Sequence, residues 1–240
     1  MTEAASGAVL DALVGRRVAG EPLEHLLGWA AFDGLRVVVT PGVFVPRVRS
    51  ELLVATVVRL ICARPDPGSE HESTGLPRPR VLDLCCGSGA VGAAVAARLP
   101  ASEVWASDVD PVAVACARRN LDADRVVEGD LYDGLPPDLH GSFDVVVVNA
   151  PYVPTDAISS MPPEARDHEP LHALDGGPDG VDLHRRVAAG VGGWLRPGGR
   201  LVIETSRGQS ALTVAACEAA GLAAYVVRDE ERDATAVVTR

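Results

Sequence analysis

After residue 80 the sequence alternates short apolar segments with Ala-rich helical segments, and this alternation constrains the fold more than any other feature. We expect strands at 81–84, 103–107, 126–127, 145–148, 200–204, 223–227 and 235–239, and helices at 89–98, 111–120, 183–195 and 210–220, with a turn at 197–199. The segment 145–148 is all valine and therefore apolar on both faces, as in a parallel strand covered by helices on both sides. The pattern predicts a Rossmann-like, doubly wound α/β fold with a mostly parallel sheet of about seven strands.

The N-terminal part of the chain is expected to form a smaller unit. Apolar residues recur at helical spacing in 4–17, and Asp33-Gly34 separates two apolar runs within 29–45, which is a strong β-hairpin signal. A helical pattern follows at 51–63, and the segment 64–80 is rich in Pro, Gly, Ser and charged residues, which is typical of a loop. The predicted organisation is an N-terminal unit at 1–63, a linker at 64–80 and a larger domain at 81–240.

The composition limits the classes of partner. The formal net charge is −11, and binding to a DNA or RNA backbone depends on many Lys and Arg contacts, so a nucleic-acid partner is not expected. There is no apolar stretch long enough to span a bilayer and no signal-peptide pattern, which predicts a cytoplasmic protein without a membrane partner. The spacing of the five cysteines and six histidines gives no metal site. We expect surface or loop positions for His25, His71, His140, His168, His172 and His184.

Carboxamide side chains are almost absent from the sequence. Asn120 and Asn149 are the two asparagines, Gln209 is the single glutamine, and all 22 basic residues are arginine. Any hydrogen bond that requires a side-chain amide must therefore use one of these three residues. Asn149 directly follows the apolar strand at 145–148, so it is the one that we expect in a functional site.

A glycine-rich loop, Asp83-Leu-Cys-Cys-Gly-Ser-Gly-Ala-Val-Gly92, follows the first strand of the larger domain. Glycines at this place let the backbone approach a ligand, and the following helix N-terminus offers free N–H groups. Dinucleotide-binding and S-adenosylmethionine-binding sheets both use such loops. Asp83 favours the second class, because its carboxylate suits a cationic sulfonium or amino group and would repel a pyrophosphate. The candidate cofactor-binding residues of this loop are Asp83, Cys85, Gly87, Ser88 and Gly89.

Further acidic residues stand at the ends of the next two strands. Asp108 is placed to accept hydrogen bonds from ribose hydroxyls. The nearby Asp110 precedes Pro111 and is the better candidate for a helix N-cap. Asp130 and Leu131 follow the third strand, where the loop at the sheet edge would meet an adenine. These residues complete the predicted cofactor site.

The strand at 145–148 runs directly into Asn149-Ala150-Pro151-Tyr152, at the edge where open α/β sheets bind ligands. The Asn149 side-chain oxygen and the Ala150 carbonyl can accept one hydrogen each from a planar NH₂ group and aim its nitrogen at a methyl donor. Tyr152 can stack on that group and face a sulfonium cation. We expect these four residues to form the catalytic site, with Asn149 also contacting the cofactor.

The tetrapeptide and the glycine loop resemble the class I S-adenosylmethionine-dependent N-methyltransferases with an Asn-Pro-Pro-Tyr motif, and more closely the peptide-chain release-factor glutamine N5-methyltransferases. Ordered matches extend over most of the chain, at 20–28, 41–47, 82–84, 143–144, 169–170, 173–174, 176–180 and 196–199. The resemblance implies that the glycine loop, Asp108 and Asp130 hold S-adenosylmethionine while Asn149 and Tyr152 hold a glutamine amide. It implies methyl transfer to the side-chain amide nitrogen of a glutamine in a protein or peptide, with a release factor as one such acceptor.

The sequence departs from the family pattern at several places. Family members begin with a helical domain that helps to recognise the release factor, whereas a short segment precedes Gly20 here. The unit at 1–63 is therefore interpreted as a remnant of the substrate-recognition region, and the chain as a shortened, divergent member. The usual Pro-Arg-Pro-Glu-Thr-Glu is replaced by Pro46-Arg-Val-Arg-Ser-Glu51, and the glycine loop begins Cys85-Cys86 in place of Gly-Thr. Ala150 replaces a proline but keeps the backbone carbonyl, so the amide-holding role is expected to persist.

Other functions remain open at this point. An adenine-N6 nucleic-acid methyltransferase would hold an exocyclic amine like an amide, but it must flip and grip a base, which the acidic chain does not favour. A small-molecule N-methyltransferase of secondary metabolism fits the absence of a helical recognition domain. A nicotinamide dehydrogenase is disfavoured by Asp83 and the tetrapeptide, and a cofactor-binding regulator would leave Asn149 without a role. The sequence does not define the oligomeric state.

Overall fold

The larger domain is built on a seven-stranded sheet in the order β5-β4-β3-β6-β7-β9-β8. The computed structural model describes residues 3–63 and 78–240, so most of the predicted linker lies outside the described residues. The strands of this sheet are β3 (Arg80–Leu84), β4 (Glu103–Asp108), β5 (Val126–Glu128), β6 (Phe143–Val148), β7 (Leu195–Glu204), β8 (Ala224–Asp229) and β9 (Ala234–Thr239). The predicted doubly wound α/β fold with a mostly parallel sheet is therefore confirmed.

The centre of the sheet is parallel and its last hairpin is antiparallel. Strands β3 to β7 pair in parallel, whereas β9 runs antiparallel to both β7 and β8. Leu84 pairs with Val148, so the glycine loop and the tetrapeptide after β6 leave the sheet side by side. All six residues of β6 are buried: the four valines are buried as their apolar run predicts, and Asp144 is buried as well.

Helices cover both faces of the sheet. One face packs against α3 (Glu51–Cys62), α4 (Ala90–Arg98) and α5 (Pro111–Ala117), and the other against α7 (Asp182–Val191) and α8 (Ser210–Ala219). Side chains alternate between the faces along each strand, so Val145 and Val147 lie in the first core and Val146 and Val148 in the second. Because α3 packs on the first face, the N-terminal segment is joined to the core of the larger domain.

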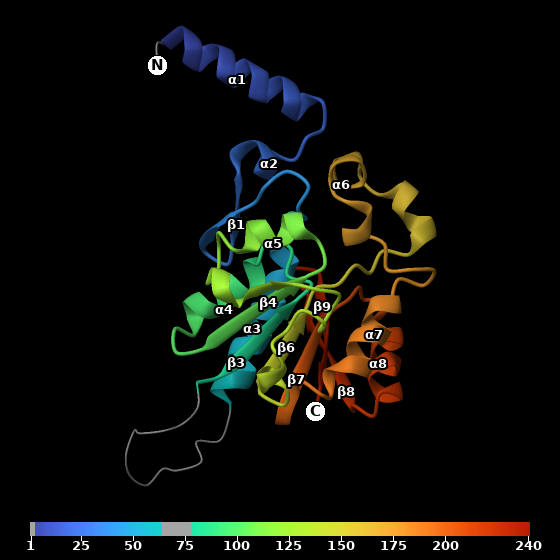
Figure 1. Cartoon of the computed structure of the whole chain (residues 1–240). Helices are drawn as coiled ribbons and strands as arrows, with labels where there is room; N and C mark the ends of the chain where they lie inside the picture. Colours follow the sequence, from blue (N-terminus) through green and yellow to red (C-terminus); the bar gives the residue numbers. More distant parts are fainter. Residues whose placement is uncertain (1–2, 64–77) are drawn as a thin grey trace.

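The N-terminal segment reaches the sheet through a short hairpin. It contains α1 (Glu3–Val18), α2 (Leu23–Leu27), β1 (Trp29–Phe32) and β2 (Leu35–Val38). The turn residues Asp33 and Gly34 both have positive φ, 49° and 78°, which is the geometry that an Asp-Gly hairpin turn requires. The predicted hairpin is therefore confirmed, although its strands end at Val38. Helix α1 extends away from the sheet, and α2 leads into the hairpin (Figure 1).

Two element boundaries after residue 180 differ from the prediction. Helix α7 ends at Val191 because Gly192 and Gly193 follow, and β7 begins at Leu195, before the predicted turn at 197–199. Leu195 pairs with Phe143 and Arg200 with Val145, so the turn residues form an irregularity inside the strand pairing. The predicted turn therefore lies inside β7 and not before it: pairing with β6 already begins at Leu195, is interrupted at 196–199, where Gly198 has a φ of 77°, and resumes at Arg200.

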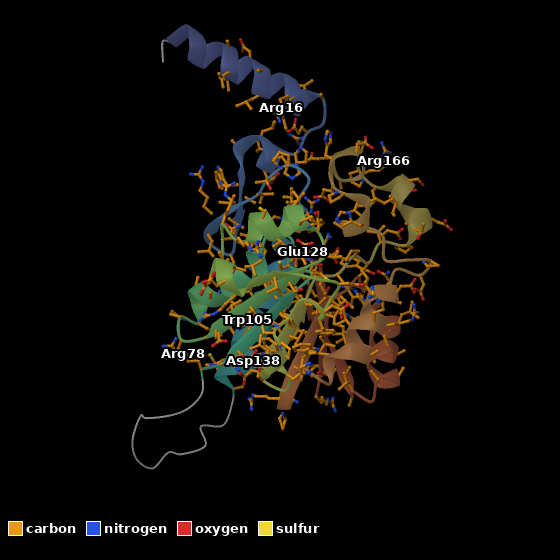
Figure 2. All side chains as sticks on the ribbon, viewed as in Figure 1. Arg16, Arg78, Trp105, Glu128, Asp138 and Arg166 are labelled. Atoms are coloured by element: carbon orange, nitrogen blue, oxygen red, sulfur yellow. The ribbon has the colours of Figure 1, made fainter. Side chains whose placement is uncertain are left out.

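The carboxyl ends of the parallel strands lie together on one side of the sheet. Glu128, the last residue of β5, lies toward that side, while Arg78, which precedes β3, lies at the opposite end (Figure 2). The N-terminal segment and α6 (Pro163–His168) lie beyond the carboxyl ends (Figure 1). Short 3-10 helices complete the fold at Val48–Ser50, Ala123–Arg125, Pro137–Leu139, Thr155–Ser160 and Leu171–Ala173.

Candidate active site

A pocket lies at the carboxyl ends of β3, β4 and β6, below the loop between β2 and α3. The predicted site residues that line it are Asp83, Cys85, Gly87, Ser88, Asp108, Asp130, Leu131, Asn149, Ala150, Pro151 and Tyr152. The residues that the sequence predicted for two different roles therefore share one pocket. The loop between β2 and α3 adds Phe44, Arg47, Arg49 and Ser50, which carried no predicted role.

Asp83 supports the glycine loop from below. It is 2% exposed, and its Oδ2 accepts a hydrogen bond of 2.8 Å from the Gly92 N–H. A Cβ atom at Gly92 would lie 3.0 Å from that oxygen, so the close approach requires glycine. Burial raises the pKa of Asp83 to about 8, so the carboxyl group is mostly neutral at pH 7 and a neighbouring cation would favour its ionised form. Asp83 thus has a structural role in the loop, in addition to the predicted contact with a cationic ligand.

The loop backbone is left-handed at three alternate positions. Cys85, Gly87 and Gly89 have φ of 57°, 55° and 74°. A Cβ at Gly87 would meet no atom within 4 Å, so it would project into the pocket, as expected where a ligand must approach the backbone. A Cβ at Gly89 would lie 2.9 Å from Leu121, and Gly89 does not line the pocket. The structure therefore places Gly89 against α5 and not among the pocket-lining residues.

The two cysteines of the loop are held as neutral thiols. Cys86 is buried and Cys85 is half-buried. Burial raises the pKa of both thiols, and the charges of Asp83 and Asp108 act in the same direction. Cys85 occupies a left-handed backbone position, where a side chain is strained and where the family pattern has glycine. Their environment is that of small packing residues.

Asp108 ties the second strand to the glycine loop. Its carboxylate accepts hydrogen bonds from the Gly87 N–H at 2.8 Å and from the Asp110 N–H at 3.0 Å. Burial raises its pKa. Asp110 caps α5 by accepting from the Val112 N–H at 2.8 Å, so the predicted division of roles between the two aspartates is confirmed for the cap.

Asp130 and Leu131 form the far end of the pocket. Asp130 pairs with Arg186 of α7 at 2.7 Å, and both side chains are about half exposed, so the pair contributes little to stability. Leu131 has φ of 55°, and its carbonyl accepts from the Ser107 hydroxyl at 2.9 Å. A bulky residue in this backbone region is strained, as residues at binding sites often are.

Asn120 joins the hairpin to the glycine loop by hydrogen bonds. Its Nδ2 donates to the carbonyls of Val38 and Ser88, both at 2.8 Å, and its Oδ1 accepts from the Val38 N–H at 2.9 Å. The side chain therefore pairs with β2 as a neighbouring strand would. This asparagine therefore serves the structure of the glycine loop.

Asn149 presents an acceptor to the pocket. Its Nδ2 donates to the Ser50 hydroxyl oxygen at 3.3 Å. Within the described residues, no donor reaches the Asn149 Oδ1 or the Ala150 carbonyl oxygen. Both residues line the pocket, and the side chain of Ala150 is buried. Two acceptors are therefore available for an NH₂ group, as the sequence predicted.

Tyr152 is held at both of its ends. Its hydroxyl donates to the Glu204 Oε1 at 3.2 Å, and its backbone carbonyl accepts from the Gln209 Nε2 at 2.7 Å. The guanidinium of Arg49 lies 5.9 Å from the ring centre. Burial, together with the charge of Glu204, raises the pKa of Tyr152, so the phenol remains a hydrogen-bond donor. The ring is thus fixed beside Asn149, and the cation that the structure places near it is Arg49.

The glycine-rich segment at 176–180 packs against this tetrapeptide. A Cβ at Gly180 would lie 2.1 Å from the Gln209 Nε2 and 2.4 Å from the Tyr152 carbonyl oxygen. A Cβ at Gly176 would lie 2.7 Å from the Tyr152 Cα. This close backbone approach explains the glycines of the matched motif without a direct role in ligand binding.

A second arginine–carboxylate pair closes the pocket near the loop between β2 and α3. Arg47 donates to the Glu169 Oε1 at 2.7 Å, and the Val45 N–H donates to the same oxygen at 3.1 Å. Glu169 is buried, and its Oε2 has no hydrogen-bond partner among the described residues. The Glu-Pro match of the sequence therefore marks a contact between the N-terminal loop and the segment before α7.

The sequence analysis missed Ser50, Glu204 and Gln209. Glu204 ends a strand at the same edge as Asn149, which is a signal that the sequence offered. Gln209 is the single glutamine, so its scarcity singled it out, but the sequence did not indicate its hydrogen-bond partners. Ser50 had no local signal.

The expectation that all histidines lie at the surface or in loops was wrong for two of them. His25 and His184 are buried: His25 contacts the Val43 carbonyl and His184 the Thr213 hydroxyl. His184 lies on the inward face of α7 with Val187 and Val191, whereas His25 is the one buried residue of α2. His71 lies outside the described residues. In the part of the chain that the structure describes, His, Cys, Asp and Glu side chains form no metal-binding group of three or more. None of the described helices is long and apolar enough to cross a membrane.

Comparison with known proteins identifies relatives. The family model of the methyltransferase small domain matches residues 62–162. The chain is 40% identical over 194 residues to the release factor glutamine methyltransferase of Streptomyces coelicolor, covering 80% of this chain and 65% of that protein. It is 39% identical over 213 residues to the release factor glutamine methyltransferase of Mycolicibacterium smegmatis, covering 87% of this chain and 70% of that protein. The chain thus spans roughly two thirds of the length of these relatives.

Among solved structures, the fold is similar to that of the hMettl16 catalytic domain in complex with the MAT2A 3'UTR hairpin 6. The TM-score is 0.63 at 14% identity, and the match covers 86% of this chain and 76% of that chain. At this identity the likeness shows a shared fold and carries no information on the acceptor.

Proposed function

The chain belongs to the family of release factor glutamine methyltransferases, and from this premise we propose that it methylates the side-chain amide nitrogen of a glutamine in a protein, with S-adenosylmethionine as methyl donor. The relatives carry the name of a release factor, and we propose a release factor as the acceptor of this chain. The single observation that carries the proposal is the pair of available acceptors, the Asn149 Oδ1 and the Ala150 carbonyl, which matches the two hydrogens of a planar amide.

The cofactor half of the pocket fits S-adenosylmethionine. The open space at Gly87 allows close approach to the loop backbone, and the carboxylates of Asp108 and Asp130 line the same pocket. Asp108 would accept from the ribose hydroxyls, and Asp130 with Leu131 would border the adenine. S-adenosylmethionine supplies an electrophilic methyl group on a sulfonium, and the acidic lining of the pocket suits its positive charge.

The chain's own residues would act mainly by positioning. An amide nitrogen is a weak nucleophile, so the orientation of its lone pair toward the methyl group is the main contribution that the pocket can make. Asn149 and the Ala150 carbonyl would each accept one amide hydrogen, and the fixed ring of Tyr152 would border the amide plane. In the transfer the nitrogen–carbon bond forms, the sulfur–carbon bond breaks, and the nitrogen releases one proton to solvent. No metal is needed for this step.

The acceptor is tested by incubating the purified chain with methyl-labelled S-adenosylmethionine and, in separate reactions, a bacterial release factor, DNA, RNA and small molecules from a cell extract. We expect label in the release factor, at a glutamine. Label in nucleic acid or in a small molecule would replace the proposed acceptor, and those outcomes correspond to the alternatives that the sequence left open.

The role of Asn149 is tested with Asn149→Ala. We expect transfer to fall by about 100-fold or more, because the amide loses one of its two orienting acceptors. Calorimetry should show a cofactor dissociation constant within about 3-fold of that of the unmodified chain, because we expect the free energy of cofactor binding to change by less than about 1 kcal/mol. Full methyl transfer by this variant would show that Asn149 does not orient the amide.

A further inference from the structure

Glu204 lies at the meeting point of three pocket-lining side chains. It is the last residue of β7 and is 3% exposed. Its Oε1 accepts from the Tyr152 hydroxyl at 3.2 Å and from the Arg49 Nε at 3.4 Å. Glu204 does not line the pocket itself, so any effect on a ligand passes through these neighbours.

Glu204 also interacts with the hydroxyl of Ser50. Burial raises the pKa of Glu204, and the Ser50 hydroxyl is the strongest of the groups that oppose this effect by hydrogen bonding. The Oε2 has no partner within regular hydrogen-bond geometry among the described residues. A buried oxygen needs a donor, and the donor assigned to it in this inference is the Ser50 hydroxyl, which opposes the rise in the pKa of Glu204.

Ser50 connects Glu204 to Asn149. Ser50 is 1% exposed, and its Oγ accepts from the Asn149 Nδ2 at 3.3 Å. A hydroxyl has a single hydrogen, whereas an ionised carboxylate can only accept. When Ser50 gives its hydrogen to Glu204, its lone pair is left to accept from the NH₂ group of Asn149.

This chain of donors and acceptors has only one favourable direction. With the Asn149 NH₂ group turned to Ser50, its Oδ1 is the atom turned the other way, free to accept from an NH₂ group in the pocket. If Ser50 instead donated to Asn149, the carboxamide would turn over and present its own NH₂ to that group. Two donors would then face each other, and neither could be satisfied.

We propose that Glu204 is a positioning residue, which fixes the orientation of the Asn149 carboxamide through Ser50 and holds the Tyr152 ring through its hydroxyl. The hydrogen-bond chain stands on the structure, while its consequence for methyl transfer rests on the proposed function. The charge of Arg49, which pairs with Oε1, lowers the pKa of Glu204 against the effect of burial, and so favours the ionised, acceptor-only form that gives the chain its direction.

The small number of carboxamides makes this orientation directly measurable. Because the chain has two asparagines and one glutamine, a ¹⁵N-labelled sample gives three side-chain NH₂ signal pairs, and Asn149→Ala identifies the pair of Asn149. In Ser50→Ala we expect the Asn149 pair to shift and its hydrogen exchange to accelerate about 10-fold, as for a hydrogen bond worth about 1 kcal/mol or more. Ser50→Thr keeps the hydroxyl and should restore the original pair.

Glu204→Gln tests the direction of the chain. Its oxygen would remain with the donors Tyr152 and Arg49, so its new NH₂ group would face Ser50 and reverse the hydrogen-bond direction. The Asn149 pair should then shift while the Asn120 pair remains in place. Glu169→Gln is the matched control, because Glu169 is also buried, paired with an arginine and left with one unpartnered oxygen. It should leave the Asn149 pair unchanged.

Transfer to a bacterial release factor gives the second readout. We expect Ser50→Ala and Glu204→Gln to lower kcat about 10- to 100-fold with little change in the KM for S-adenosylmethionine, and Ser50→Thr to restore kcat. If the unmodified chain transfers no methyl group, the proposed function fails, and the signals of Asn149 still decide the positioning role. An Asn149 pair that is unchanged in both Ser50→Ala and Glu204→Gln would overturn the inference. Should Glu204→Gln fail to fold, the two Ser50 variants decide it alone.

Discussion

In the proposed cofactor half of the pocket (83–92, Asp108 and 130–131), carboxylates accept from backbone N–H groups that are at most 21 residues away, whereas in the proposed acceptor half (149–152) side chains from more distant segments meet. Asp83 and Gly92 are nine residues apart, while Asn149 and Ser50 are separated by 99. Tyr152 is held by Glu204 and Gln209, which are 52 and 57 residues away.

The difference follows from what each half must do. A nucleotide can be held by backbone groups of a loop, which a short motif can place by itself. A small amide must be oriented within a narrow angular range, and this needs side chains that are themselves fixed by other side chains. Each half also contains one supporting carboxamide, Asn120 for the cofactor half and Gln209 for the acceptor half, which allows matched substitutions.

Of the two substitutions of supporting carboxamides, Gln209→Ala is expected to have the larger effect. Its Nε2 donates to the carbonyls of Tyr152 and Asp179 at 2.7 and 3.0 Å, so the variant leaves both without this donor. We expect a loss of about 1–3 kcal/mol in the free energy of unfolding and a fall in kcat of about 10-fold or more. Urea unfolding and steady-state kinetics measure both. Gln209→Glu, which keeps the size but has no N–H donors, should behave similarly, and normal kcat in both variants would contradict this role of Gln209.

A smaller effect in the other half is expected from Asn120→Ala. Three hydrogen bonds that join Val38 and Ser88 are removed, so the glycine loop should become less well ordered. At about 1 kcal/mol of lost binding energy, the dissociation constant of S-adenosylmethionine should rise about 5-fold. Calorimetry measures the constant. At saturating cofactor, kcat should fall less than in Gln209→Ala; an equal fall would mean that the two halves are not separately supported.

A different kind of effect is expected from Asp83→Asn, as a change in the pH dependence of stability. The folded chain holds the Asp83 proton up to a pKa of about 8, whereas the unfolded chain releases it near pH 4, the usual value for aspartate. The folded state therefore binds more protons in this window, and ionisation of Asp83 reduces stability as the pH rises from about 4 to about 8. Asparagine does not ionise, so the Asp83→Asn variant does not lose this stability as the pH rises.

The difference in unfolding free energy between Asp83→Asn and the unmodified chain should therefore shift in favour of the variant from pH 5 to pH 8 and become constant above it. Glu169 and Glu204, whose pKa values are also raised by burial, are present in both proteins, so their contributions cancel. The charge of Asp108 acts on Asp83, so the measured difference includes the change in this coupling. A difference independent of pH would show that Asp83 is ionised throughout.

Much of the fold could be predicted because its signals are local. The valines of β6, the Asp-Gly turn and the cap at Asp110 each act within a few residues, and each appears in the structure where the sequence placed it. The start of β7 could not be predicted, since its first residue is fixed by pairing with Phe143 of another strand. The buried rings of His25 and His184 likewise depend on what packs against their helices.

The sequence by itself determined the alternation of strands and helices, the glycine loop and the position of Asn149 at the end of a buried strand. These features arise from side-chain periodicity and from backbone preferences, which neighbouring residues set. Only the tertiary structure decided that Ser50 contacts Asn149, that Glu204 joins Tyr152 and Arg49, and that Gln209 holds the backbone of Tyr152. Those contacts join separate strands and loops, and the direction in which a carboxamide points is set by the donors and acceptors that folding brings beside it.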